Sequence, residues 1–240
     1  MRLTLTVQSN GPPAKASGLT LAGQAYELIK RDLCEFRMLP GDEFTEIELV
    51  TRLGVSRTPV RQALYRLEQE GFVLLRQHSG WRVRPFDVER FEALYDVRLV
   101  LEQAAVMRLC SLRGIEDIHE LGALKRFWLV PPEERLRNGK VLAEYDEAFH
   151  YALVAAAGNP EMAGIHHEVN EKIRIIRQLD LTKDCRVDTS YQEHSAILRA
   201  IFARRMDEAV RMLKSHIEIS KAEIRKITLH RLQEARQLWT

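Results

Sequence analysis

The chain has 240 residues, of which 45% are hydrophobic and 29% are charged, and its formal net charge is +2. This length is enough for two domains, and the composition is that of a globular protein rather than a disordered or fibrous one. No apolar run approaches the roughly 20 residues of a membrane-spanning helix, and residues 1–18 lack the continuous apolar core of a secretory signal. The three cysteines are isolated and form no CxxC motif, so we expect a reducing compartment.

The first part of the chain predicts a tail followed by two helices. Residues 1–18 contain two glycines and a proline pair, which is typical of a flexible tail. A helical pattern then runs from about Leu21 to Phe36. The segment 45–54 predicts a second, shorter helix, because Thr45 and Glu48 have the spacing of a capping box.

Residues 54–71, GVSRTPVRQALYRLEQEG, have the pattern of a helix that buries one face and carries arginines on the other. Ser56 is placed to cap this helix through its hydroxyl group, and only two residues separate it from the preceding helix. So tight a turn indicates a helix-turn-helix motif, whose second helix enters the DNA major groove. Taken alone, the stretch would more often be an amphipathic helix with a solvated basic face. The apolar stripe consists of Val60, Ala63, Leu64 and Leu67, and the other side carries Arg57, Thr58 and Arg61.

The segment FVLLRQHSGWRV, residues 72–83, has two β-prone runs around a polar turn at His78–Gly80. This arrangement predicts a β-hairpin wing beside the helices. Between residues 52 and 84 the chain has seven arginines and only two acidic residues, Glu68 and Glu70. Such a local excess of positive charge suits contact with nucleic-acid phosphates.

These segments together resemble the winged-helix DNA-binding domain of GntR-family bacterial transcription regulators. The resemblance covers residues 21–84 and is most specific between Gly54 and Gly71. Many members have an arginine where this chain has Ile47, and we expect Arg52 to substitute for it in part. The residues that the resemblance places on double-stranded DNA are Ser56, Arg57, Thr58 and Arg61 in the recognition helix, Arg52 before it, and Gly80 at the tip of the wing.

From residue 85 onward the periodicity is helical nearly everywhere, and Asp87 is placed to cap the first helix. We predict a mainly α protein, with a tail (1–18), an N-terminal winged helix-turn-helix domain (19–84) and a C-terminal all-α bundle (85–240). Thr189 and Gln192 have the spacing of another capping box. The six predicted helices span residues 88–112, 115–128, 138–157, 161–180, 189–204 and 206–236.

Four polar residues of the helical part lie on apolar faces. Asp146 and His150 are four residues apart on one helix, and His194 and His216 lie on two later helices. A single histidine on such a face is more often a satisfied core residue than a ligand. One aspartate and three histidines on inward faces of one bundle are nevertheless a good ligand set for zinc, nickel, manganese or iron. We therefore predict a divalent metal ion, with zinc expected in the purified protein.

The segments DEAFH (146–150) and EHSAIL (193–198), together with Asn159–Pro160, resemble the FCD ligand-binding domain of FadR-type GntR regulators. Acyl-CoA-binding members lack the histidine set, which argues against a fatty acyl-CoA effector. Six helices rather than seven indicate the VanR-like subgroup. The resemblance implies dimers on palindromic operators, and it places each of four residues on a metal-ligand position: Asp146, His150, His194 and His216.

The helix predicted over residues 88–112 carries Arg98 on an apolar face, one turn before Glu102. The guanidinium could pair with Glu102 within the fold, or it could bind the carboxylate of a small acid. The resemblance places an effector-binding arginine here. Asn170 and Arg174, four apart on a later helix, are further candidates for lining the cavity, although a solvated face explains such a pair more often.

These observations predict a ligand-responsive DNA-binding regulator rather than an enzyme, and the family resemblance implies a repressor. Four protein ligands leave coordination positions on the ion for a small carboxylic acid, whose binding would change the spacing of two DNA-reading domains. Three alternatives stay open: a metal-dependent hydrolase or lyase with a DNA-binding domain, a sensor of the metal itself, and a purely structural metal. The candidate surface for a homodimer is an apolar stripe of Val97, Val100, Leu101 and Ala104.

Overall fold

The computed structural model describes residues 19–76, 80–181, 184–227 and 234, so the predicted tail (1–18) lies outside the described part. Contacts divide the chain into two compact units. In the described part, residues 19–31 and 43–82 form the first unit, and residues 32–42 and 83 onward form the second. In the second unit Phe36 and Leu39 pack against Leu179. The first helix was predicted to end at Phe36. It ends earlier, at Cys34, because Phe36 has a φ of +57°, which no right-handed helix allows.

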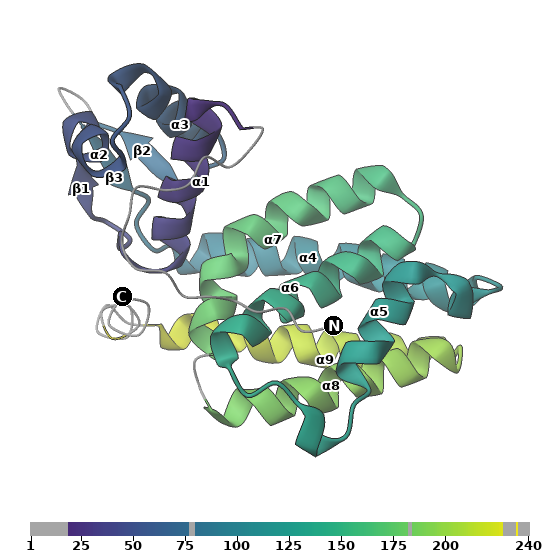
Figure 1. Ribbon diagram of the computed structural model, residues 1–240. Helices are drawn as coiled ribbons and strands as arrows, with labels where there is room; N and C mark the ends of the chain where they lie inside the picture. Colours follow the sequence, from purple (N-terminus) through teal and green to yellow (C-terminus); the bar gives the residue numbers. More distant parts are fainter. Residues whose placement is uncertain (1–18, 77–79, 182–183, 228–233, 235–240) are drawn as a thin grey trace. The chain divides into compact units, whose positions relative to one another are not determined.

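The first unit combines three helices with a small sheet (Figure 1). The strand order is β1-β3-β2, and β1 pairs antiparallel with β3. Two residues are too few to show the alternation of a strand, so the sequence did not predict β1. His78 and Ser79 of the predicted turn lie outside the described residues. The elements of this winged helix-turn-helix are α1 (Leu21–Cys34), β1 (Glu43–Phe44), α2 (Glu46–Leu53), α3 (Arg57–Gln69), β2 (Val73–Leu75) and β3 (Trp81–Val83).

The local sequence explains the ends of α2 and α3. The predicted capping box is confirmed, because the hydroxyl of Thr45 accepts from the N–H of Glu48 at 3.2 Å and the Glu48 carboxylate accepts from the N–H of Thr45 at 2.6 Å. Gly54 closes α2 with a φ of +68°, a conformation that favours glycine. Ser56 is the N-cap of α3, but its hydroxyl accepts no hydrogen bond from the helix, so that prediction is wrong. Pro59, the third helical residue, has no N–H, which removes one of the two donors that a capping hydroxyl can use.

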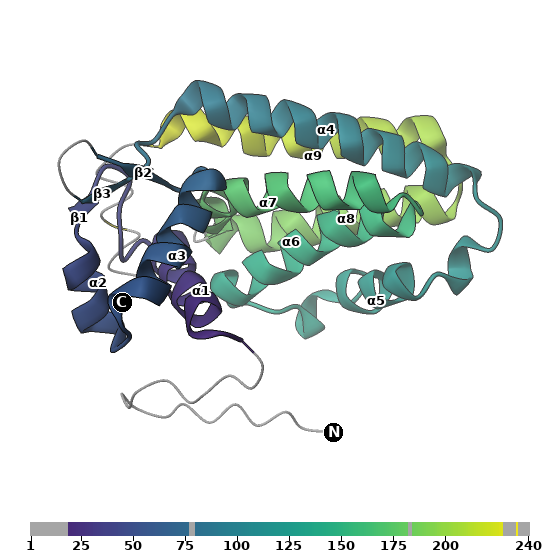
Figure 2. The same cartoon turned by 90° about the horizontal axis from the view of Figure 1, so that it is seen from above.

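The second unit is a bundle of long helices, as predicted (Figure 2). Asp87 caps α4 by accepting from the N–H of Arg90 at 3.1 Å. Helix α8 begins five residues before its predicted start, so Thr189 lies inside the helix and the predicted capping box with Gln192 is wrong. The helices of this unit are α4 (Val88–Ser111), α5 (His119–Trp128), α6 (Gly139–Ala156), α7 (Pro160–Leu181), α8 (Asp184–Phe202) and α9 (Met206–Glu223), with 3-10 turns at Ile115–Asp117, Pro132–Glu134 and Ile224–Lys226.

Helix α4 packs on α6, α7, α8 and α9, and Figure 2 shows α4 and α9 side by side over much of their length. Within the described residues, the core between these helices is mostly apolar and contains one large polar cluster. Since the members come from all five helices, the candidate site lies inside the bundle. In the described part of the chain, no helix is both long enough and apolar enough to cross a membrane. The buried polar residues include Arg98, Glu102, Asp146, His150, His166, Asn170, Arg177, His194 and His216.

Candidate nucleic-acid interface and metal centre

The recognition helix α3 buries one face and presents its first turn to solvent. The buried side chains are Pro59, Val60, Ala63, Leu64 and Leu67. The exposed ones include all the predicted DNA-contacting residues near this turn: Ser56, Arg57, Thr58 and Arg61, with Arg52 on α2. Exposed arginines at the start of such a helix are available to phosphates and base edges. A shallow pocket of about 220 Å³ is lined by Arg57, Thr58, Arg61, Gln62 and Tyr65.

Acidic residues from neighbouring elements hold these arginines. Glu46 of α2 accepts two hydrogen bonds from Arg61, each 2.9 Å long, and lies 3.9 Å from Nε of Arg57. The hydrogen bonds from Arg61 hold the pKa of Glu46 below its usual value. Glu43 of β1 pairs with Arg76. The charge count over residues 52–84 missed both acids, because they precede that window and reach the arginines only in the folded unit.

Gly80, the predicted wing residue, has a structural reason to be glycine. Its φ is +93°, and a Cβ there would lie 2.9 Å from the carbonyl oxygen of Phe44. Since Phe44 belongs to β1 and pairs with Trp81 of β3, a side chain at residue 80 would push these strands apart. The requirement for glycine therefore comes from the sheet, whether or not the wing touches DNA.

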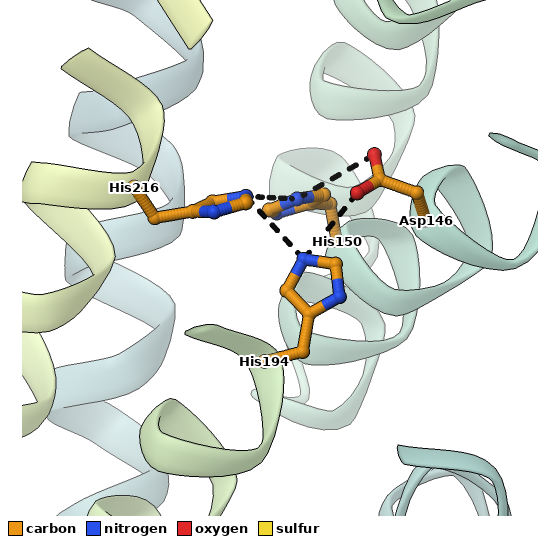
Figure 3. A group of neighbouring side chains, drawn as sticks. All are labelled: Asp146, His150, His194 and His216. Carbon is orange, nitrogen blue, oxygen red and sulfur yellow. Dashed lines mark hydrogen bonds and ion pairs between the residues drawn. The ribbon is translucent and has the colours of Figure 1, made fainter. Parts of the chain in front are cut away.

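Asp146 and His150 on α6, His194 on α8 and His216 on α9 point at a common centre (Figure 3). One ligand atom from each residue lies within 4.8 Å of all the others, and all four residues are buried. Nε2 of His216 is 3.1 Å from Nε2 of His150 and 3.3 Å from Nε2 of His194. Oδ1 of Asp146 lies 3.4 Å from Nε2 of His194. Three nitrogens and one carboxylate around a point fit the donor set of a divalent transition-metal ion.

Carboxylates behind two of the imidazoles determine which nitrogen faces the centre. Glu102 lies 2.7 Å from Nδ1 of His150, and Glu193 lies 2.7 Å from Nδ1 of His216. An ionised carboxylate only accepts, so each Nδ1 carries the proton and each Nε2 turns a lone pair toward the centre. This is the tautomer that a metal ligand requires.

His194 is held by packing instead. Its ring stacks on Phe149, with centroids 4.0 Å apart, and meets the ring of Trp128 edge-on at 4.1 Å. Its Nδ1 is buried and has no hydrogen-bond partner within the described residues. Aromatic contacts thus orient the third imidazole, while hydrogen bonds orient the other two.

Burial and nearby charges keep the donors in their metal-binding forms. Burial lowers the pKa of His150 to about 3, and the charge of Arg98 contributes further. Burial likewise holds the pKa of His194 well below its usual value. Burial alone would raise the pKa of Asp146, but Arg177, at 2.5 Å, lowers it and keeps the carboxylate ionised. Neutral imidazole and ionised carboxylate are the forms that bind a divalent ion.

Two family patterns match the chain. The family described as "Bacterial regulatory proteins, gntR family" matches residues 21–83, and the "FCD domain" matches residues 93–219. The Nta operon transcriptional regulator of Aminobacter aminovorans is 32% identical over 183 residues, which are 76% of this chain and 84% of the relative. The chain belongs to the GntR family of transcriptional regulators.

This GntR regulator is also similar to the transcriptional repressor RspR of Escherichia coli K12, at 22% identity over 85% of this chain and 89% of the relative. Its fold matches the solved structure of E. coli McbR/YncC with a TM-score of 0.68 at 17% identity, over 87% of this chain and 98% of that one. The matching families and relatives are regulators of transcription, not enzymes. These comparisons support a transcriptional regulator and not the alternative of a metal-dependent enzyme.

Of the predicted effector residues of this GntR regulator, three are buried and one is partly exposed. Arg98 and Glu102 are buried beside the metal-ligand cluster and form an ion pair, with 2.7 Å between Nε and Oε1. One terminal nitrogen of Arg98, Nη2, has no hydrogen-bond partner within the described residues. Asn170 is also buried and does not lie on a solvated face. Arg174 is partly exposed and bonds to two acids, Glu147 and Glu171.

Three residues that hold the cluster were missed in the sequence. Glu193 contacts His216, Arg177 contacts Asp146, and His166 contacts Glu102. His166 and Arg177 could have been found in the sequence, because together with Asn170 they have the spacing of residues on one face of α7. Glu193 gave no such signal, since its neighbour His194 faces the centre and the glutamate itself is partly exposed.

Proposed function

We propose that this GntR regulator is a cytoplasmic, homodimeric repressor that releases a palindromic operator when a small carboxylic acid binds at a divalent metal ion. The observation that carries this proposal is the convergence of Asp146, His150, His194 and His216, with two of the imidazoles oriented by carboxylates. Histidines that bind a metal almost always donate their other ring N–H to a carboxylate, a backbone carbonyl or water, which fixes the ring's tautomer and orientation. Zinc, nickel, manganese and iron all suit the donor set.

When bound, the ion would supply positively charged coordination positions for carboxylate oxygens. The four donors would hold the ion, while Glu102 and Glu193 keep His150 and His216 in the required tautomer. Arg98 also supports an acid ligand. Its buried Nη2 donates no hydrogen bond within the described residues, and a carboxylate oxygen of the ligand would accept one. We include Glu102, Asn170 and Arg174 in the proposed effector region, Glu102 and Asn170 through their contacts with the cluster and Arg174 as an outer residue.

In the proposed division of labour, residues 19–84 read DNA and residues 85–240 bind the ligand and the partner protomer. Ser56, Arg57, Thr58 and Arg61 would contact the major groove, with Arg52 and the wing at Gly80 on the backbone. The apolar side chains of α4 support a dimer surface, since Val97 is 43% exposed and Val100 is 66% exposed. The repressor assignment follows the name of the relative RspR.

The deciding experiment titrates DNA affinity with ligand. The protein is stripped with a chelator, and its affinity for a duplex selected in vitro is measured with zinc, with a panel of small mono- and dicarboxylic acids, and with both. We expect an acid to weaken DNA binding only when zinc is present. A response to zinc alone would make the protein a metal sensor. Unfolding on chelation would make the metal structural, and a failure to bind zinc would overturn the proposal.

A further inference from the structure

A chain of buried contacts, one ion pair followed by hydrogen bonds, connects two of the proposed metal ligands through α7. It starts at Asp146, whose Oδ2 is 2.5 Å from Nε of Arg177. Nη2 of Arg177 donates to Oδ1 of Asn170 at 3.3 Å, and Nδ2 of Asn170 lies 3.3 Å from Nδ1 of His166. From His166 the chain continues across to α4, because Nε2 of His166 is 3.0 Å from Oε1 of Glu102.

The chain returns to α6 at Glu102, whose other oxygen, Oε2, is 2.7 Å from Nδ1 of His150. Asp146 and His150 are one turn apart, so the ion pair and the hydrogen bonds form a loop that begins and ends on the same helix. All of its residues are at most 6% exposed. In such a setting water does not compete, so each donor and acceptor depends on its neighbour in the loop.

The directions of the hydrogen bonds between Arg177 and Glu102 follow from the guanidinium of Arg177. A guanidinium only donates, so the Asn170 oxygen accepts and its NH₂ group donates to Nδ1 of His166. Since Nδ1 of His166 is an acceptor, its proton is on Nε2, which donates to Glu102. His150 carries its proton on Nδ1. The two histidines that share Glu102 are thus held as opposite tautomers.

We propose that His166 is a positioning residue for the metal centre. Glu102 accepts from His166 and Arg98 on Oε1, and these two bonds set the rotation of the carboxylate that presents Oε2 to His150. Removing the bond from His166 would let the carboxylate turn, and the Nε2 lone pair of His150 would no longer be held toward the centre. The inference rests on the proposed metal site, but it assigns a role to a histidine outside the ligand set.

The first test measures zinc affinity by competition with a chelating dye. His166→Leu removes both hydrogen bonds of residue 166, and we expect it to weaken zinc binding about 10- to 100-fold, as loss of an outer-shell partner does. In His166→Gln the side-chain amide can donate to Glu102 and accept from Asn170, so we expect near wild-type affinity. The matched control is His167→Leu, because His167 is the exposed neighbour on the same helix and takes no part in the loop. Equal zinc affinity in His166→Leu and wild type would overturn the proposal.

The second test needs no metal. Nitrogen-15 NMR of the imidazoles in chelator-treated protein should show His166 protonated on Nε2 and His150 on Nδ1. In His166→Gln this state of His150 should persist, and in His166→Leu, if that variant folds, part of the signal should move to the other tautomer. Protonation of His166 on Nδ1 in the wild type would refute the inference. Wild-type protein that lacks zinc affinity but has these tautomers would refute only the proposed function.

Discussion

Two arginine–glutamate ion pairs of similar length lie in the two units of this regulator, in opposite surroundings. In the first unit Arg61 contacts Glu46 at 2.9 Å, and their side chains are 51% and 18% exposed. In the second unit Arg98 contacts Glu102 at 2.7 Å, and their side chains are 2% and 0% exposed. Water screens the first pair and leaves it free to exchange partners. If either member of the second pair is removed, the other remains as an uncompensated charge in the core.

The difference matches the role proposed for each unit. A residue that reads DNA must leave its resting partner for a phosphate or a base, so a weak, solvated pair suits it. A residue that orients a metal ligand must stay in place, so a buried pair with further hydrogen bonds suits it. Similar charged side chains thus serve as exchangeable contacts at one surface and as fixed scaffolding in one core.

The largest expected effect comes from breaking the buried pair. Glu102→Gln leaves the charge of Arg98 without its counter-ion, and we expect the free energy of unfolding to fall by about 3–5 kcal/mol. Urea unfolding of the metal-free protein measures this. Glu46→Gln, the same change in the exposed pair, is the control and should leave the free energy of unfolding nearly unchanged. Similar losses in both variants would contradict the contrast between the two pairs.

A smaller loss of unfolding free energy is expected at Gly80, where β1 and β3 of the first unit approach closely. Gly80→Ala places a Cβ against the carbonyl of Phe44 in a backbone conformation that disfavours alanine, and we expect a loss of about 1–3 kcal/mol in unfolding free energy. Gly164→Ala is the matched control, because nothing lies within 4 Å of its Cβ position in α7 and alanine favours a helix. An undamaged Gly80→Ala protein with weakened DNA binding would instead assign the glycine to DNA contact alone.

The exposed pair is tested through DNA. Arg61→Ala should weaken binding to a selected duplex about tenfold or more and reduce the salt dependence by about one phosphate contact, while the thermal unfolding temperature stays the same. Arg211→Ala, which removes an exposed arginine on α9, should change neither quantity. Wild-type affinity in the Arg61→Ala protein would remove this residue from the DNA interface.

The most gradual effect, spread over several pH units, sharpens the contrast in burial. The pKa of His150 is about 3 in the folded protein and near 6.5 when unfolded, so between these values only the unfolded chain takes up its proton. Stability therefore falls as the pH falls below 6.5, by at most about 1.4 kcal/mol per pH unit for this group. Urea unfolding of metal-free protein from pH 7 to 5 should show a steeper fall in wild type than in His150→Gln. Parallel curves would contradict the assignment.

Much of the first unit could be predicted from contiguous residues. The capping box at Thr45, the apolar stripe of α3 and the arginines of its first turn all depend on spacing within one helix, which any helical backbone reproduces. The predicted hydroxyl cap of Ser56 is wrong, and Pro59, which has no N–H, removes one of the two donors that it could use. The acids that pair with Arg61 and Arg76 could not be predicted. Glu46 lies on α2 and Glu43 on β1, and only the folded unit brings these elements beside the arginines.

For the bundle, the sequence determined that α6, α8 and α9 would each turn a histidine inward, because apolar residues at helical spacing surround each one. Only the tertiary structure decided that the three imidazoles and Asp146 meet at one point. It also decided which nitrogens carry protons, because Glu102 lies 48 residues from His150, and Glu193 lies 23 residues from His216. Burial of the apolar faces sets how the helices register against one another, and that register, which no single helix encodes, brings these groups together.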